Sequence, residues 1–485
     1  MKKINRNRLL AFSLSLFFGA SLFAQESPAG EAAPEAGTRD GVQAAKTPAA
    51  EKEPPANTVE AARLATIHYG TETEIAALIQ VLKNEGSDYL DEELTALAEN
   101  TRNQNILSGL FTFFGDRGKS GLEDRAIRAL EDRYEETNEA VLSAADYLGK
   151  VKAAKAIPAL RELLDSGEQR FMNAAFRALG RAGGMNAEGG DEIAEYLIDY
   201  YSKRDPADEN RREIIIALGA AGSKNGVDFL AEIAENNEEK TTLRIAALDS
   251  LSKIGDPGGL KAILVSASAG DPNVRSAAVA ALGPFSGEEV DKVILEAFRD
   301  SYYRTRLAAA QAARQRRLEA AIPYLKFRAE RDDVPQVKDE AIRALGAIAN
   351  EESNGIVGDF FSERKNSDRV RLVSAEMLMK NEPVKYLDKM IIEIDEAKRQ
   401  NQTPLYNGFL KVIGESKTES LETITRRFLK NGGILEKSYG LDMAANNGFA
   451  SLADEIRALT REKNESLAQK ARRTLEKLGI GEEEK

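Results

Sequence analysis

The sequence contains no cysteine and no tryptophan, and it has a single histidine among 485 residues. The absence of cysteine excludes disulfides, thiol nucleophiles, thiolate metal sites and acylated cysteine anchors. One histidine cannot build a histidine-based metal cluster or a serine–histidine triad. Aromatic residues make up only 6% of the chain, which is thin for a conventional large core. We therefore expect no catalytic residues, no cofactor and no metal site.

Positive charge is also in deficit, because 67 Lys and Arg face 79 Asp and Glu and the formal net charge is −12. An acidic surface repels phosphate backbones and anionic lipids, so we expect no nucleic-acid partner. A chain of 485 residues exceeds the roughly 250–300 residues at which single cores stop growing. The protein must therefore consist of several domains or of an open-ended stack.

Long apolar runs are missing except at the start of the chain. Residues 1–24 combine a basic head, the apolar run Leu9–Phe18 and small residues before a candidate cleavage point after Ala24, which predicts a secretory signal peptide. The run is shorter than the ~20 residues that a permanent membrane span needs. We expect an exported, soluble protein without a transmembrane segment in its mature chain, and the periplasm is its expected location.

The composition changes twice along the remaining chain. Residues 25–57 hold five Pro, nine Ala and five Glu but no aromatic residue, which predicts a disordered tether. From residue 58 to residue 480 the apolar pattern is helical throughout, and residues 481–485 form a polar tail.

The clearest helical stretch is Val274–Gly283, which reads VRSAAVAALG. Its apolar residues recur at helical spacing, Asp271 and Pro272 favour a start, and Gly283 favours a left-handed stop. The apolar stripe is almost entirely alanine, so a neighbouring backbone can approach closely. The Leu-Gly end of this helix has counterparts at steps of 31 to 39 residues, ending at Gly115, Gly149, Gly180, Gly219, Ser252, Gly283, Arg314, Gly346, Met379, Gly414, Asn446 and Gly479. Such a period predicts about twelve stacked repeats.

The repeat resembles the HEAT-like repeat, in particular the short bacterial form of the phycobilisome lyases. The residues that carry the resemblance are LRIAA at 243–247, VRSAA at 274–278 and VRLVS at 370–374. The resemblance implies an all-α solenoid of two-helix units in a right-handed superhelix, with the second helices lining the concave wall. It also implies a structural ladder between adjacent repeats, formed by an acid six residues before a base: Glu238 and Arg244, Asp300 and Arg306, Asp332 and Lys338.

Two candidate binding surfaces stand out. The position of Ala280 varies in charge and size among its counterparts on successive second helices, which are Arg177, Ile216, Asp249, Gln311, Arg343 and Glu376. We expect this column to face the groove and to bind protein. The other candidate is the one dense basic and aromatic stretch, Tyr302, Tyr303, Arg304, Arg314, Arg316 and Arg317. An insertion at residues 181–191 lengthens one repeat to 39 residues and predicts a loop.

These features favour a non-enzymatic scaffold or adaptor that binds another envelope protein along the concave face. A lyase-like or chaperone-like modifier of the phycobilisome-lyase type is the alternative that the resemblance implies. Glycan binding through Tyr302 and Tyr303, or nucleic-acid binding, ranks below both. The oligomeric state stays open.

Overall fold

The computed structural model describes residues 59–184, 187–204 and 208–481. These residues form 26 α-helices and six short 3₁₀ helices, and they contain no strand, so the predicted all-α repeat fold is confirmed. The predicted signal peptide, the predicted tether and residues 482–485 of the predicted tail lie outside the described residues.

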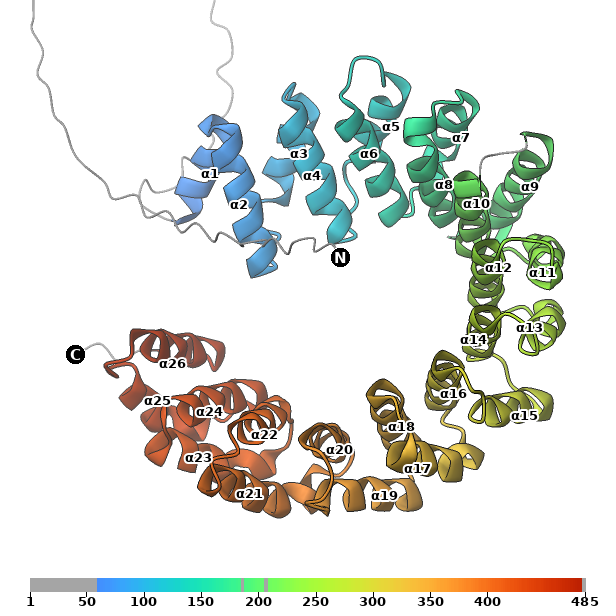
Figure 1. The fold of residues 1–485 in the computed structure, drawn as a ribbon. Coiled ribbons are helices and arrows are strands. Elements are labelled where there is room, and N and C mark those ends of the chain that lie inside the picture. The colour runs from blue at the N-terminus through green and yellow to red at the C-terminus, as the bar shows by residue number, and fades with distance from the viewer. Residues whose placement is uncertain (1–58, 185–186, 205–207, 482–485) are drawn as a thin grey trace, which may run out of the picture. The chain divides into compact units, whose positions relative to one another are not determined.

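The helices form antiparallel pairs, and the second helices stack on one another as an inner layer while the first helices form an outer layer (Figure 1). The inner helices are α2 (Glu72–Glu85), α4 (Gln104–Asp116), α6 (Asn138–Lys150), α8 (Gln169–Gly183), α10 (Asp208–Ala221), α12 (Thr241–Ile254), α14 (Pro272–Ala281), α16 (Tyr303–Arg316), α18 (Pro335–Ile348), α20 (Asp368–Asn381), α22 (Thr403–Glu415), α24 (Ile434–Asn447) and α26 (Glu465–Lys477).

The outer helices are α1 (Val59–Tyr69), α3 (Asp91–Asn100), α5 (Glu123–Glu131), α7 (Ile157–Asp165), α9 (Ala187–Arg204), α11 (Val227–Glu235), α13 (Leu260–Ser266), α15 (Glu288–Ala297), α17 (Ile322–Arg331), α19 (Glu351–Ser362), α21 (Pro383–Arg399), α23 (Glu422–Asn431) and α25 (Ala453–Leu459). The twelve predicted repeat marks fall on or just after α4 to α26 in turn. The pair α1 and α2 precedes them.

Helix α14, which contains most of the stretch Val274–Gly283, begins where Asp271 and Pro272 predict. The Asp271 carboxylate accepts a hydrogen bond from the Asn273 N–H at 2.8 Å, and Pro272 occupies the first turn of α14. The expected left-handed stop at Gly283 is wrong, because α14 ends at Ala281 and Leu282 caps it in the right-handed region. A Cβ at Gly283 would lie 2.1 Å from the Gln315 side-chain oxygen of the next repeat, which is the end of a flexible side chain that can move aside.

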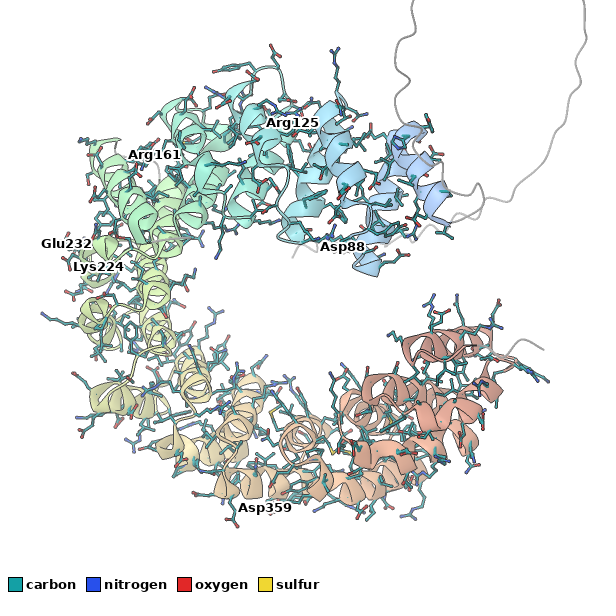
Figure 2. All side chains as sticks on the ribbon, turned by 180° about the vertical axis from the view of Figure 1, so that it is seen from behind. Asp88, Arg125, Arg161, Lys224, Glu232 and Asp359 are labelled. Atoms are coloured by element: carbon teal, nitrogen blue, oxygen red, sulfur yellow. The ribbon has the colours of Figure 1, made fainter. Side chains whose placement is uncertain are left out.

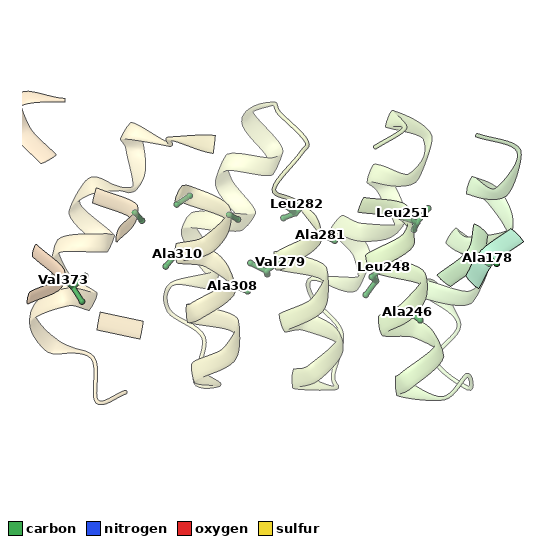
Figure 3. Close-up of a cluster of buried hydrophobic side chains, with 14 of the residues drawn as sticks. Ala178, Ala246, Leu248, Leu251, Val279, Ala281, Leu282, Ala308, Ala310 and Val373 are labelled. Carbon is green, nitrogen blue, oxygen red and sulfur yellow. The ribbon is translucent and has the colours of Figure 1, made fainter. Parts of the chain in front are cut away.

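Close approach of small residues holds the inner layer together. Figure 3 shows Ala246, Ala281, Ala308 and Ala310 buried along successive inner helices. At the seam between α8 and α10, a methyl group on Gly180 would stand 2.5 Å from the backbone carbonyl oxygen of Ala217. Helices packed at this distance gain dispersion contacts over their whole length and leave no room for an additional methylene.

The predicted loop at residues 181–191 is wrong for the greater part of that range. Residues 187–191 belong to α9, which has 18 residues where α7 and α11 have nine each. The extra residues therefore lengthen an outer helix.

Substitution of two helical glycines separates close packing from helix propensity. Gly180→Ala should destabilise the protein by about 1–3 kcal/mol, because the new methyl overpacks the seam with Ala217. Gly109→Ala in α4 should stabilise it by about 0.5–1 kcal/mol, because nothing lies within 4 Å of the added Cβ. Urea-unfolding midpoints followed by circular dichroism measure both. Equal effects of the two substitutions would contradict close packing at Gly180.

Candidate functional site

The structure places the predicted column on the open side of the inner layer. Its members lie on α8, α10, α12, α14, α16, α18 and α20 in order, one on each helix. Arg177, Asp249, Gln311 and Glu376 are exposed, while Ile216 and Arg343 are half-buried. The column therefore follows the inner face across seven consecutive repeats.

The middle of this column lines a groove. Two adjoining hollows of about 440 Å³ each lie side by side on α10 to α18, and they share Ile245, Ala277 and Ala280. We call this continuous surface the inner groove. Its lining is Arg212, Ile216, Thr242, Ile245, Ala246, Asp249, Ser252, Asn273, Ser276, Ala277, Ala280, Ala281, Tyr303, Arg304, Leu307, Ala308, Gln311 and Gln336.

The floor of the inner groove is apolar because one helix face recurs in each repeat. Ile245 and Leu307 stand four residues before Asp249 and Gln311, which places each pair on one face of its helix. Between them α14 presents short side chains, with Ala277 and Ala280 shared by both hollows, so the surface is lowest at this helix. The column residues Ile216, Asp249 and Gln311 line the groove, whereas Ile245 and Leu307 were missed by reasoning that used one position per helix.

Outside the inner groove, ion pairs cross the inner layer instead. Arg177 lies 3.5 Å from Glu213 of the next inner helix, and Arg343 lies 3.8 Å from Glu376. Glu376 also lines a separate hollow beside α22. The predicted column is therefore one surface only in its middle part.

The predicted basic and aromatic patch does not form one surface, because α16 is a helix of 14 residues that separates its members by about 20 Å. Tyr303 and Arg304 line the inner groove, and the Tyr302 hydroxyl donates to Asn273 Oδ1 at 2.9 Å. At the opposite end of α16, Arg314 pairs with Glu340 at 2.6 Å and Arg316 pairs with Asp291. Arg317 is the C-cap residue of the helix.

Charge divides sharply between the two layers over α7 to α20. Among the side chains that the structure describes, the seven inner helices carry 17 Arg and Lys against 6 Asp and Glu, and the seven outer helices carry 7 against 17. Figure 2 shows Glu232 and Asp359 on the outer side. The excess of acids on these outer helices is offset by the excess of cations on these inner helices. Over α8 to α20 the inner layer is basic, so the expected acidic surface does not extend to these helices.

An arginine ladder links the repeats at the N-terminal ends of the inner helices. Arg275 donates to the Asp300 carboxylate of the following repeat at 2.9 and 3.2 Å, and Arg306 donates to the Asp332 carboxylate at 2.7 and 2.8 Å. Each arginine also donates to two backbone carbonyls of its own repeat at 3.0–3.1 Å. The planar guanidinium thereby ties an acid and a loop together at each seam.

The ladder does not follow the predicted pairing of an acid with the base six residues later. The base instead binds the acid of the next repeat. Arg244 and Lys338 have no such acid, because Ala269 follows Arg244, and Lys365 follows Lys338, at the position that Asp300 and Asp332 occupy in their repeats. Arg244 is buried and donates to the Ala234 carbonyl at 3.0 Å, and Lys338 donates to the Glu330 carbonyl at 3.2 Å. Glu238 has no side-chain partner among the described residues.

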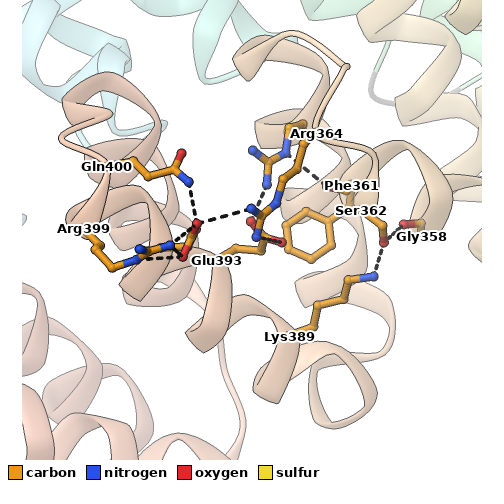
Figure 4. A network of polar contacts seen from close by, with 10 residues as sticks. Gly358, Phe361, Ser362, Arg364, Lys389, Glu393, Arg399 and Gln400 are labelled. Carbon is orange, nitrogen blue, oxygen red and sulfur yellow. Dashed lines mark hydrogen bonds and ion pairs between the residues drawn. The ribbon is translucent and has the colours of Figure 1, made fainter.

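A related network lies further along, between α19 and α21 (Figure 4). The buried Arg371 donates to the Glu393 carboxylate at 2.6 Å and to the Phe361 carbonyl at 3.2 Å. Arg364 lies 4.0 Å from Glu393, and Lys389 donates to the Ser362 hydroxyl. This network uses the same arginine position, because Arg371 is the counterpart of Arg275 and Arg306.

The acids of the ladder are held ionised. Burial alone would raise the pKa of Asp332, but hydrogen bonds from the Arg306 guanidinium and the Val334 N–H outweigh it and lower this pKa. Burial opposes ionisation at Asp300 as well, where hydrogen bonds from Arg275 and the Tyr302 N–H bring the pKa below its ordinary value. The ladder therefore weakens only at strongly acidic pH.

The described part of the chain offers neither a metal centre nor a membrane span. Within it, no group of three or more His, Cys, Asp or Glu side chains converges as a metal site would require. None of its helices combines the length and the apolar character needed to cross a bilayer.

Paired helices in two layers, a period of 31 to 39 residues and an arginine ladder define a HEAT-repeat solenoid. A family model described as "Spirochaete HEAT repeat protein" matches residues 67–474, and the chain belongs to this family. The predicted HEAT-like repeat is thereby confirmed. No curated protein matches the sequence.

Among solved structures, those of Kap121p match part of the chain at low similarity. The structure of Kap121p bound to Ste12p is 13% identical with a TM-score of 0.40, covering 86% of this chain and 52% of that chain. The structure of Kap121p bound to Nup53p is 13% identical with a TM-score of 0.41, at 86% and 53% coverage. The chain thus spans about half the length of these proteins.

Breaking the ladder at Arg306 should be costly. Arg306 and Asp332 are 7% and 3% exposed, and Arg306→Met removes both Arg306 hydrogen bonds from this buried carboxylate. Asp332 then keeps only the Arg328 guanidinium at 3.3 Å and the Val334 N–H, so the substitution should destabilise the protein by about 1.5–3 kcal/mol at pH 7. The matched control Lys338→Ala, at the counterpart position, should cost less than about 0.5 kcal/mol because Lys338 holds only a carbonyl. Urea unfolding of the three proteins measures the difference.

The same comparison should depend on pH. Because the pKa of Asp332 is lowered in the folded state, the contribution of the pair is complete above the unfolded pKa of about 3.9 and disappears as the pH falls through the folded value. The gap between the wild-type protein and Arg306→Met should therefore narrow at pH 3. A gap at pH 7 no larger than that of Lys338→Ala would contradict the ladder.

Proposed function

We propose that the protein is a non-enzymatic scaffold that binds a segment of another protein in the inner groove. One observation carries this proposal: an apolar floor of Ile245, Ala277, Ala280 and Leu307 runs without interruption across consecutive repeats on an otherwise charged layer. Exposed apolar surface that is bordered by polar side chains is characteristic of protein–protein contact sites.

The groove would act through preformed area. Five lining side chains come from each of α12, α14 and α16, and their positions are set by helices that pack against both neighbours. A segment that enters the groove meets side chains that are already ordered, so the protein contributes little ordering cost to binding. Repeat proteins collect affinity in this way from many small contacts.

The proposed partner is a protein of the cell envelope. The support lies in the sequence, where residues 1–24 have the basic head, apolar run and small-residue end of an export signal. The single histidine and the absence of cysteine support a role without catalysis, as does the lack of any convergent metal-binding cluster in the described residues.

A photocrosslinking amino acid tests the binding face directly in cells. Placed at Gln311 in the groove, it should yield a discrete covalent adduct with a polypeptide. The same group at the exposed Lys261 of the outer helix α13 should not. Ala280→Arg should reduce the Gln311 adduct at least fivefold, because the long side chain fills the lowest part of the floor. Deleting residues 2–24 should abolish the adduct, because the chain then stays apart from its partner.

Equal adducts from Gln311 and Lys261 would contradict the assignment of the groove as the binding face. An adduct that is insensitive to Ala280→Arg would do the same. An adduct that persists without residues 2–24 would contradict the envelope location while leaving the binding face intact.

A further inference from the structure

We propose that the segment bound in the inner groove is an extended acidic peptide, with carboxylates about eight residues apart and small apolar residues between them. This inference rests on the proposed function and adds the chemistry of the partner. It follows from the arginines of the inner groove, from its shallow apolar floor and from the amide side chains that line it.

Arginines line the groove at its α10 end and on α16, next to its α18 end. Arg304 has no carboxylate partner among the described residues; it lies about 6 Å from the rings of Tyr302 and Tyr303, and its Nε donates to the Tyr303 hydroxyl at 3.2 Å. Arg212, with a side chain 52% exposed, shares the single carboxylate of Glu213 with Arg177 at 3.1 and 3.5 Å. Among the described side chains, each of these places therefore has more guanidinium groups than carboxylates, which suits a carboxylate ligand.

The separation of these arginines sets the length of the ligand. Arg212 lies on α10 and Arg304 on α16, three steps along the inner layer. Neighbouring packed helices lie about 8–10 Å apart, so the two positions are separated by about 25–30 Å. An extended chain advances about 3.3 Å per residue, so roughly eight residues join carboxylates that reach both ends.

The floor selects small side chains between the acids. Ala277 and Ala280 leave only a shallow depression between Ile245 and Leu307, which accepts Ala, Val or Pro more readily than an aromatic ring. Asn273, Gln311 and Gln336 line the same surface. Because a side-chain amide both donates and accepts hydrogen bonds, this rim can satisfy the main chain of an extended peptide.

The charge division between the layers adds selectivity. An acidic segment is attracted by the inner helices, with their 17 Arg and Lys against 6 Asp and Glu, and is repelled by the outer helices with 7 against 17. Such complementarity favours encounter at one face and suppresses docking elsewhere. A nucleic acid fits less well, because its regularly spaced phosphates would cross the uncharged floor and Asp249.

Fluorescence anisotropy with defined peptides tests this inference on the purified protein. The first probe carries two Glu pairs eight residues apart, separated by Ala and Val. The second replaces every Glu with Lys, and the third places the Glu pairs four residues apart. The first probe should bind at least tenfold more tightly than either of the others, and its affinity should fall as sodium chloride is raised from 50 to 500 mM.

Charge reversal in matched variants locates the binding. Arg212→Glu combined with Arg304→Glu should weaken the first probe at least tenfold. Lys261→Glu combined with Arg331→Glu changes the net charge equally on the exposed outer face and should alter the affinity less than twofold. Circular dichroism confirms that both variants are folded.

Three results would overturn the inference: equal binding of the Lys probe, no effect of the inner reversal, or tighter binding of a single-stranded oligonucleotide or an anionic lipid vesicle at the same arginines. A Gln311 adduct in cells together with failure of the acidic probe would leave the proposed function standing and reject only the acidic chemistry. Binding of the acidic probe without a Gln311 adduct in cells would reject the proposed function.

Discussion

Close contact between the backbones of neighbouring inner helices is the constraint on which the rest of this structure depends. Gly180 against Ala217, and the alanines at 246, 281, 308 and 310, allow each inner helix to approach the next more closely than the outer helices approach one another. A stack that is tighter on one side must present that side as its inner face. The inner groove is a direct result, since the same small residues that close the seams leave Ala277 and Ala280 as its floor. The close packing of the inner helices and the shape of the inner groove therefore have the same cause.

The charges are organised around this packing. Short side chains at the seams leave the loop ends of the inner helices without apolar cover, and the arginine ladder fills these positions with hydrogen bonds to carboxylates and carbonyls. Arginine suits the task because its fork reaches both groups at once. The ladder places arginines on the inner helices, while acids outnumber cations on the outer helices over α7 to α19. A chain with a net charge of −12 can thus present a basic face to a partner.

Much of this was predictable from the sequence, since a recurring Leu-Gly end and an alanine stripe define both the period and the inner helices. The site was predictable only in its middle part. The predicted column uses one position per helix, that of Ala280. A helix face also includes the positions four and seven residues earlier, and Ile245, Leu307 and Asn273 line the groove at such positions. The ladder partner was misplaced because an acid six residues before a base is a pattern within one repeat, whereas the bond crosses to the next. The predicted basic and aromatic patch does not form one surface, because its residues are close in the sequence but lie at opposite ends of α16.

Hydrogen–deuterium exchange of the protein, with and without the acidic probe of eight-residue spacing, tests the central claim most directly. The account predicts that bound probe slows exchange in α12, α14 and α16, whose inner faces form the floor, and leaves α11, α13, α15 and α17 unchanged. Protection that is confined to the outer helices, or spread equally over both layers, would contradict the claim that the closely packed inner layer is the binding face.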